Sequence, residues 1–264
     1  MINLKDKVNG KSREGGLGQK NKTKLHFRRF EFKYLMPIQT ADKIIPSLLE
    51  HMQWDPYVIN TGKEYYNVNS LYYDSAGFGC YYEKIAGVSA RSKFRLRFYN
   101  KLEEDSKIFI EIKRKRDNII IKDRIMENLD ETFNILNTNE YPNYLKKLDK
   151  QKKAVLEEFL WAKNYASLKP QIMVSYLRKP LVSKYDDKFR VTFDYNIKTH
   201  KADWLDRPVG PVKDVLMDNL VLELKYNNFL PLWFYDIIEK YRLFRVPYSK
   251  YCTSLEKIHT NLVN

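Results

Sequence analysis

Cysteine, histidine and glycine are all scarce in this chain of 264 residues. The two cysteines, Cys80 and Cys252, are too few and too far apart to form the disulfide framework of a small secreted domain, so we expect a reducing compartment. The four histidines are scattered, with no HExxH motif and no Cys/His cluster, which argues against a zinc site. A short glycine run, Gly15-Gly16-Leu17-Gly18, has no strand before it and no Gly-Lys-Ser/Thr after it, so it predicts no phosphate loop.

Long apolar segments and common catalytic motifs are missing as well. No run of about 18 apolar residues is present, so we expect no membrane-spanning helix. The amino terminus lacks the apolar core of a signal peptide, and the chain has neither a Gly-x-Ser-x-Gly elbow nor a dinucleotide fingerprint. We therefore expect a soluble, cytoplasmic protein. If it binds nucleotide or phosphate, side-chain cations must replace the backbone amides that other folds use.

Positive charge is abundant but unevenly placed. The chain has 47 Lys and Arg against 33 Asp and Glu, a net charge of +14. Residues 1–29 hold nine of these cations and two acids, which is +7 and leaves +7 for the rest of the chain. We expect residues 1–24 to be a disordered basic tail, able to contact a membrane surface or a protein partner, and residues 25–264 to form one domain. That domain is only mildly basic, so any strong field in it must come from clustering.

The sequence does contain a set of segments in which charged and apolar residues alternate. In residues 93–98, three cations share one face of a strand, while two phenylalanines and a leucine share the other. Residues 29–34, 109–113, 189–194 and 220–225 repeat the scheme. Strands are predicted near residues 27–35, 67–74, 91–100, 107–115, 118–127, 171–178, 188–195 and 219–226.

Helical spacing of apolar residues occurs in three other regions. It runs from Ile38 to Met52, from Leu145 to Leu160, and from about Pro231 to Leu243, where the proline stands at the helix start. Strands mostly in runs, with helices between some of them, predict an α+β fold. Eight strands suffice for a barrel that holds one ligand. We therefore expect an eight-stranded antiparallel β-barrel with a charged lumen and flanking helices.

The charged faces of these strands can be explained in two ways. An ordinary half-buried sheet with one face in water is the simpler explanation for any single segment. Five such segments, dense in Arg and Lys, favour a barrel whose charged face turns inward and forms a water-filled tunnel for a polyanion. The cations expected to face inward are Lys33, Arg95, Arg97, Lys113, Lys122, Arg124, Arg178, Arg190 and Lys225.

Four carboxylates fall on the same faces of the predicted strands. For Glu31, Glu111 and Asp194 we expect ion pairs with the inward cations. Glu223 stands between apolar neighbours on the face of Lys225. It either binds Mg²⁺ or Mn²⁺ together with phosphate oxygens or forms an ion pair, and the residues leave both roles open.

Short motifs recur in order along roughly residues 27–257. They are Arg29-x-Glu31-x-Lys33-Tyr34, Ser70-Leu71-Tyr72-Tyr73-Asp74, Lys93-x-Arg95-x-Arg97-Phe98-Tyr99, Glu111-Ile112-Lys113, Arg190-Val191-Thr192-x-Asp194, Leu222-Glu223-Leu224-Lys225 and Tyr248-Ser249-Lys250-Tyr251. Together they resemble the VTC domain, the polyphosphate polymerase branch of the triphosphate tunnel metalloenzymes within the CYTH-like superfamily.

The resemblance implies transfer of the ATP γ-phosphate to a growing polyphosphate chain inside a tunnel, with Mn²⁺ or Mg²⁺. The catalytic cations that it implies are Lys33, Arg95, Arg97, Lys113, Lys122, Arg178, Arg190 and Lys250. Further substrate contacts are expected at Arg29, Tyr72, Arg124, Lys225 and Ser249. The metal ligands expected are Glu223 and Glu31.

Three functions compete at this point. The first is an ATP-using polyphosphate polymerase, the second a hydrolase of triphosphate or polyphosphate on the same tunnel, and the third a binding module without catalysis. Arg29 stands where the wider superfamily has the first glutamate of Glu-x-Glu-x-Lys, which disfavours two-metal hydrolysis. Nucleic acid is the weakest candidate ligand, because the aromatic residues that could stack on bases lie on the strand face opposite the cations.

Overall fold

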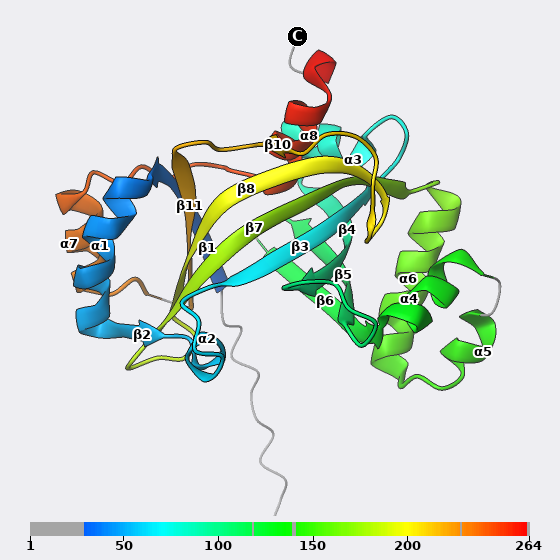
Figure 1. Cartoon of the computed structure of the whole chain (residues 1–264), viewed down its shortest axis with the longest axis horizontal. Helices are drawn as coiled ribbons and strands as arrows, with labels where there is room; N and C mark the ends of the chain where they lie inside the picture. Colours follow the sequence, from blue (N-terminus) through cyan, green and yellow to red (C-terminus); the bar gives the residue numbers. More distant parts are fainter. Residues whose placement is uncertain (1–28, 118, 139–140, 228, 263–264) are drawn as a thin grey trace, which may run out of the picture.

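The computed structural model describes residues 29–117, 119–138, 141–227 and 229–262 (Figure 1). These residues form one curved sheet with helices packed around it. The predicted tail, residues 1–24, lies outside the described residues. The α-helices are α1 Ile38–His51, α2 Pro56–Asn60, α3 Gly79–Ile85, α4 Leu129–Asn137, α5 Tyr141–Leu145, α6 Lys150–Tyr165, α7 Leu232–Lys240 and α8 Lys250–Ile258.

Backbone hydrogen bonds join the main strands in the order β1-β11-β8-β7-β3-β4-β5-β6, with every neighbouring pair antiparallel. They are β1 Arg29–Pro37, β3 Tyr66–Asp74, β4 Ala90–Tyr99, β5 Lys107–Arg116, β6 Ile119–Asn128, β7 Lys169–Ser183, β8 Arg190–Trp204 and β11 Asn219–Asn227. Short strands pair beside them, namely β2 Met52–Trp54, β9 Arg207–Pro208 and β10 Lys213–Asp214. The predicted α+β class and the antiparallel sheet are confirmed.

The predicted closure into a barrel is not confirmed. In the part of the chain that the structure describes, β6 and β1 stand at the two ends of the strand order and do not pair with each other. The sheet is nevertheless curved (Figure 1), and Lys113 Nζ on β5 lies 3.0 Å from Glu31 Oε2 on β1. A charged side-chain contact therefore joins the end strand β1 to β5, the neighbour of the other end strand, where the prediction expected a backbone ladder between the end strands. We call the concave side of the sheet, on which Lys113 and Glu31 meet, the charged interior.

One half of the convex face is covered by α1 and α7 (Figure 1). The apolar residues of β8 and β11 that alternate with charged ones point here, among them Val191 and Leu222, which are fully buried. Ile44 of α1 and Phe234 of α7 belong to the same buried cluster. The alternation in the sequence thus separates the two faces as predicted, because successive strand residues point to opposite sides.

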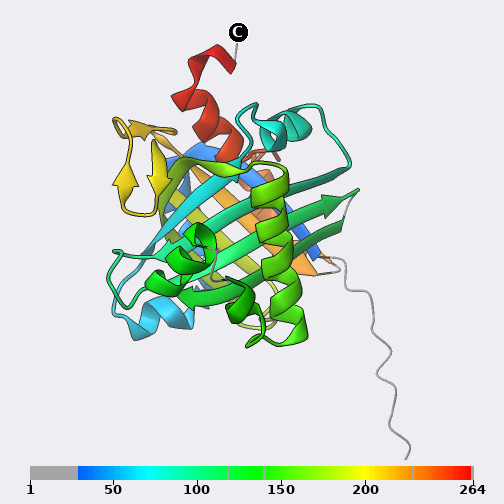
Figure 2. The ribbon, with the colours of Figure 1, turned by 90° about the vertical axis from the view of Figure 1, so that its right-hand side faces the viewer.

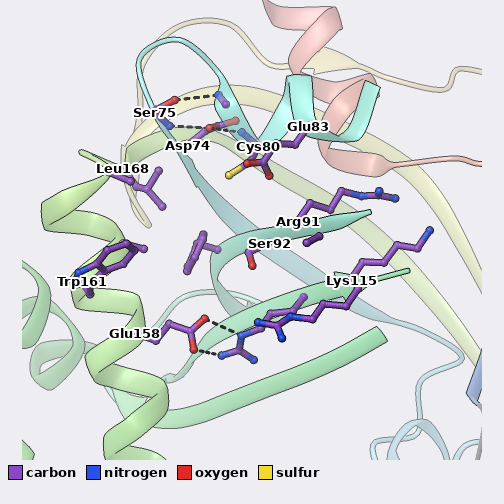
Figure 3. Close-up of a pocket in the computed structure, with 17 residues that line it drawn as sticks. Asp74, Ser75, Cys80, Glu83, Arg91, Ser92, Lys115, Glu158, Trp161 and Leu168 are labelled. Atoms are coloured by element: carbon purple, nitrogen blue, oxygen red, sulfur yellow. Dashed lines mark hydrogen bonds and ion pairs between the residues drawn. The ribbon is translucent and has the colours of Figure 1, made fainter. Parts of the chain in front are cut away.

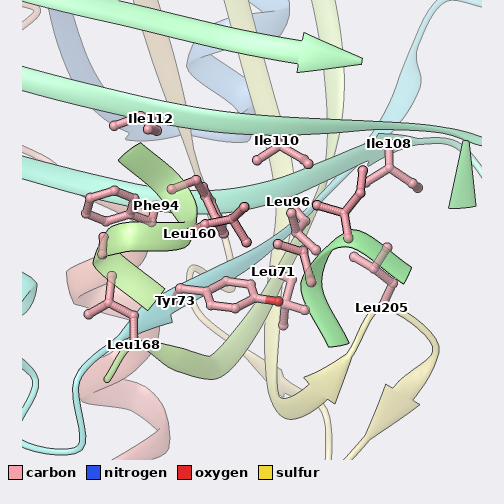
Figure 4. Packing of buried hydrophobic residues seen from close by; sticks show 14 of the residues in the cluster. Leu71, Tyr73, Phe94, Leu96, Ile108, Ile110, Ile112, Leu160, Leu168 and Leu205 are labelled. Carbon is pink, nitrogen blue, oxygen red and sulfur yellow. The ribbon is translucent and has the colours of Figure 1, made fainter. Parts of the chain in front are cut away.

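The other half of the convex face is covered by α4 and α6, and Figure 2 shows α6 crossing in front of β4 to β6. Phe94 and Leu96 of β4 and Ile110 and Ile112 of β5 pack there with Leu160 of α6 (Figure 4). Burying such side chains contributes about 1.5–3 kcal/mol each. These apolar contacts hold the cationic residues that alternate with them on the concave side.

Helices α3 and α8 close one end of the sheet. Asp74, at the end of β3, is fully buried and accepts hydrogen bonds from the backbone N–H groups of Cys80 and Tyr81 in α3, at 2.9 and 3.2 Å. It also accepts a short hydrogen bond from the hydroxyl of Tyr251 in α8. One carboxylate therefore fixes both helices to the sheet, and α8 lies with its first turn against the charged interior.

The three predicted helices correspond to α1, α6 and α7. The five that were not predicted, α2, α3, α4, α5 and α8, are five to nine residues long, too short for a helical period to show clearly. Within the described residues, no helix combines the length and the apolar character that crossing a membrane requires.

Candidate active site

Glu111 is the centre of one cluster of charges in the interior. It is fully buried on β5, and its Oε2 accepts a hydrogen bond of 2.7 Å from Arg95 Nε on the neighbouring β4. Arg97 Nε lies 3.8 Å from the same oxygen, and Lys122 Nζ on β6 lies 2.5 Å from Oε1. Three of the expected phosphate-binding cations thus meet around one carboxylate, which has the ion-pair role expected for it.

Asp194 and Glu223 organise a second cluster. Arg178 on β7 makes a two-pronged contact with Asp194 on β8, with distances of 2.7 and 2.8 Å. Lys250 Nζ lies 2.5 Å from Asp194 Oδ2 and 3.8 Å from Glu223 Oε2. Lys225 Nζ lies 2.5 Å from the other oxygen of Glu223. The first residue of α8 is therefore held by carboxylates from two strands.

Glu31 forms a third cluster. The two strands register Glu31 opposite Lys225 and Lys33 opposite Glu223, so cations and carboxylates alternate between β1 and β11. Glu31 lies 3.4 Å from Lys33 and 3.0 Å from Lys113. These positive neighbours outweigh burial and the charge of Glu223, both of which would raise the pKa of Glu31, and lower it to about 2.

The start of α8 is held from both sides of the interior. Ser249 is the N-cap residue, and its hydroxyl accepts a hydrogen bond from the backbone N–H of Cys252. Lys93 Nζ on β4 donates to the same hydroxyl at 2.8 Å, and Lys33 Nζ on β1 donates to the carbonyl of Tyr248 at 3.1 Å. Ser249 and Lys250 therefore lie among the cationic residues of the strands.

Tyr72 on β3 is the aromatic member of the site. Its hydroxyl accepts a hydrogen bond of 2.9 Å from Arg95 Nη1. Burial would raise the pKa of this phenol, but Arg95, Arg97 and Lys93 outweigh burial and lower it to about 8. The cations of the interior therefore stabilise negative charge on this hydroxyl.

The lysines of the interior are crowded. Burial lowers the pKa of Lys113 to about 8, with Lys33 and Lys225 adding to the effect and Glu31 opposing it. For Lys122, burial together with Arg95 and Arg97 outweighs Glu111 and lowers the pKa to about 7. Lys250 differs, because Asp194 outweighs burial and raises its pKa above the usual range. Two of the lysines therefore lack enough negative charge nearby to stay fully protonated.

Two expected residues stand apart from these clusters. Arg190, at the start of β8, has about half of its side chain exposed, with Nη1 3.5 Å from Asp55 Oδ2. The guanidinium of Arg124, an exposed residue of β6, lies 4.9 Å from the ring centre of Phe109. Both lie at the margin of the interior. The side chain of Arg29 is outside the described residues.

Lys93 was missed as a site residue. Its ammonium contacts Ser249 and lies 5.2 Å from the ring centre of Tyr251, so it belongs to the site. The sequence contained the signal, because Lys93 shares the strand face of Arg95 and Arg97. Ser70 was also missed as a partner. Its hydroxyl accepts a hydrogen bond of 3.1 Å from Arg97 Nε, and its small size gives no such signal.

Glu223 and Glu31 are the carboxylates that could hold a metal. Within the described residues no group of three or more Asp, Glu, His or Cys side chains could enclose a metal ion. Mg²⁺ suits such a site, because it binds through one or two carboxylates together with substrate phosphates and water. The residues present therefore fit a divalent ion that arrives with a phosphate ligand, and lysine ion pairs occupy both carboxylates without one.

A comparison with known families identifies the chain. The model of the VTC domain matches residues 28–259. The chain belongs to the VTC domain family. The resemblance seen in its motifs is thereby confirmed, and membership indicates a function related to polyphosphate or triphosphate.

Solved structures of low identity also match this VTC domain. One is a candidate adenylyl cyclase from Hippeastrum with a dominant triphosphatase activity, at 12% identity and TM-score 0.48, covering 87% of this chain and 97% of the other. Another is a candidate adenylate cyclase from Vibrio parahaemolyticus, at 10% identity and TM-score 0.40, covering 84% and 94%. No curated protein matches the chain.

Proposed function

We propose that this VTC domain is a metal-dependent polyphosphate polymerase, which transfers the γ-phosphate of ATP to the end of a polyphosphate chain held in the charged interior. One observation carries the proposal. Among the described residues, cations from six strands and from α8 surround four interior carboxylates, Glu31, Glu111, Asp194 and Glu223. The positive charge that remains uncompensated suits a polyanion.

The reaction needs positioning and charge stabilisation more than it needs covalent help. The bond between the γ-phosphorus and its bridging oxygen breaks, ADP leaves, and a terminal oxygen of the chain forms the new bond to phosphorus. Arg95, Arg97 and Lys122 could hold one run of phosphates, with Arg178 and Lys250 holding another. Each guanidinium can bind two phosphate oxygens at once and fix their orientation.

The four interior carboxylates do not supply the base that transfer to water would use. A hydrolase needs a base whose pKa lies near the working pH. The pKa of Glu31, Glu111, Asp194 and Glu223 is lowered in every case, because neighbouring cations outweigh burial. These carboxylates are therefore weak bases, whereas the terminal phosphate of a chain is already anionic and needs none.

A divalent ion would complete the charge balance. Glu223, with Glu31 beside it, would hold the ion together with phosphate oxygens, and the ion would supply a Lewis acid at the transferring phosphate. Lys225 and Lys113, now paired with these carboxylates, would then be free to contact the chain.

The proposal is tested by incubating the purified full chain with ATP and either Mn²⁺ or Mg²⁺ and separating the products. Phosphate chains with equivalent ADP are the expected result. Free phosphate without chains would identify a hydrolase. No conversion of ATP under any divalent ion, with retained binding of polyphosphate, would identify a receptor and overturn the enzymatic proposal.

A further inference from the structure

The cationic side of the interior does not end where the clusters described above end. On β4, β5 and β6 the inward residues form rows across neighbouring strands. One row pairs Lys93 with Lys113 and Lys113 with Lys122. The next row toward the strand ends pairs Arg91 with Lys115. Cations therefore follow one another along the same strand faces beyond the candidate active site.

The two rows differ in how their charge is compensated. Like charges directly opposite each other across a sheet are destabilising. Each lysine of the first row has a polar partner, which is Ser249 for Lys93, Glu31 for Lys113 and Glu111 for Lys122. In the second row the polar partner of Arg91 is a backbone carbonyl, and no carboxylate of the described residues lies within ion-pair distance of either cation.

Within the described residues, neither Arg91 nor Lys115 forms an ion pair with a carboxylate. The polar contact of Arg91 is a short hydrogen bond from its guanidinium to the backbone carbonyl of Val88. Glu83 of α3 lines the same cavity as Arg91, but the two form no ion pair in that part of the chain. An anion between Arg91 and Lys115 would supply the missing negative charge.

The side chains of Arg91 and Lys115 point away from the packed region between the sheet and α6 (Figure 3). Figure 3 shows Arg91 and Lys115 pointing the same way from the strand ends, away from Trp161 and Glu158 of α6. Both line a cavity of about 540 Å³ between the ends of β4 and β5, α3 and α6.

We propose that Arg91 and Lys115 form an outer phosphate subsite, which binds a polyphosphate chain where it leaves the charged interior. This inference rests on the proposed function. Arg91 precedes Arg95 by four positions along β4, which corresponds to about 13 Å of extended strand. A triphosphate held at Arg95 does not span that distance, whereas a longer chain does. The subsite therefore distinguishes long chains from short ones.

The test compares two ligands by calorimetry on the full chain, without ATP or metal. The ligands are tripolyphosphate and a long polyphosphate chain. The variant is Arg91→Ala with Lys115→Ala, and the matched control is Arg207→Ala with Lys198→Ala, which removes the same two charges from an exposed region of β8 and β9. Thermal melting of each variant verifies that it is folded.

We expect the Arg91/Lys115 variant to bind the long chain at least about tenfold more weakly and tripolyphosphate within about twofold of the unsubstituted protein. The control should keep both affinities. Equal losses for both ligands, or losses matched by the control, would mean a general effect of charge and overturn the subsite. Unchanged binding of the long chain would overturn it too. If the unsubstituted protein binds neither ligand, the proposed function itself fails.

Discussion

Glu223 carries the most specific chemical role proposed for a single side chain here. It is nearly buried, and its two oxygens face Lys225 on one side and Arg178 and Lys250 on the other. Burial would raise its pKa, but these cations and Lys33 hold it well below the usual range. Glu223 is therefore ionised whenever a divalent ion could bind.

Glu223→Gln should abolish ATP turnover, because the amide keeps the shape but loses the charge that Mg²⁺ or Mn²⁺ requires. Metal-free binding of polyphosphate should be retained or tightened, since one negative charge leaves the interior. Turnover assays and calorimetry measure the two effects, with the exposed Glu64→Gln as the matched control. Full turnover in Glu223→Gln would assign Glu223 a structural ion pair instead.

Lys113 and Lys122 should take up protons when a phosphate ligand binds. Their pKa values of about 8 and about 7 leave both partly neutral at pH 8. A bound anion raises the pKa of each, and it raises the pKa of Tyr72 in the same direction. Calorimetry of tripolyphosphate binding at pH 8, in buffers of different ionisation enthalpy, should show proton uptake that disappears below pH 6. Binding enthalpies independent of the buffer would contradict this.

The stability of the ligand-free protein should also depend on the protonation of these two lysines. Because the pKa values of Lys113 and Lys122 are lowered on folding, the unfolded state binds more protons above about pH 7. These lysines therefore make the free energy of unfolding rise with pH in that window, up to their unfolded pKa values. Urea titrations at several pH values measure this, and saturating tripolyphosphate should weaken the trend.

At the scale of the elements, α8 shows how a short helix brings polar and charged groups to the concave side of a sheet. Its first turn carries Ser249 and Lys250, and the N-cap hydroxyl of Ser249 also accepts a hydrogen bond from Lys93. Ser249→Ala should lower the free energy of unfolding by about 1 kcal/mol, because it removes the cap. Turnover should fall further than this loss of stability explains, because Lys93 loses its partner. Equal losses in Ser249→Ala and in Ser75→Ala, which changes an exposed contact to Gly79, would argue against a special role.

Strands and helices differed in how well the sequence predicted them, for physical reasons. The eight long strands were predicted because every second residue must be apolar to face α1, α6 or their neighbours. That same alternation placed Arg95, Lys113 and Glu223 in the interior. It could not place Lys250, whose position depends on the tertiary contact between α8 and Asp194.

Alternation also does not reveal where a strand emerges from the fold. Arg190 has the inward parity that the sequence predicted, yet it is the first residue of β8, with about half of its side chain exposed and its guanidinium near Asp55. The predicted closure of the sheet into a barrel is likewise not confirmed. Parity is a local property, whereas pairing between β6 and β1 depends on the twist and tilt of the whole sheet.

The whole molecule should be stabilised by its substrate class. Tripolyphosphate should bind the folded state and relieve repulsion among the interior cations, so it should raise the melting temperature. At a hundredfold excess of ligand over Kd, the free energy of unfolding should increase by about 2.7 kcal/mol. Added salt should stabilise the ligand-free protein slightly and reduce the increment from tripolyphosphate. A melting temperature that does not change with tripolyphosphate would remove the basis for a phosphate site.

The contact between Lys113 and Glu31 should couple ligand binding in the interior to the spacing between two strands. It connects two strands, β5 and β1, that no backbone ladder joins among the described residues. A phosphate chain competes with Glu31 for Lys113, so binding should break this ion pair and let β1 and β5 move apart. A long phosphate chain could then enter the interior from the side, through the widened seam between β1 and β5, instead of passing in end first. Amide exchange on β1 should accelerate with long chains, and slower exchange would show that the seam tightens instead.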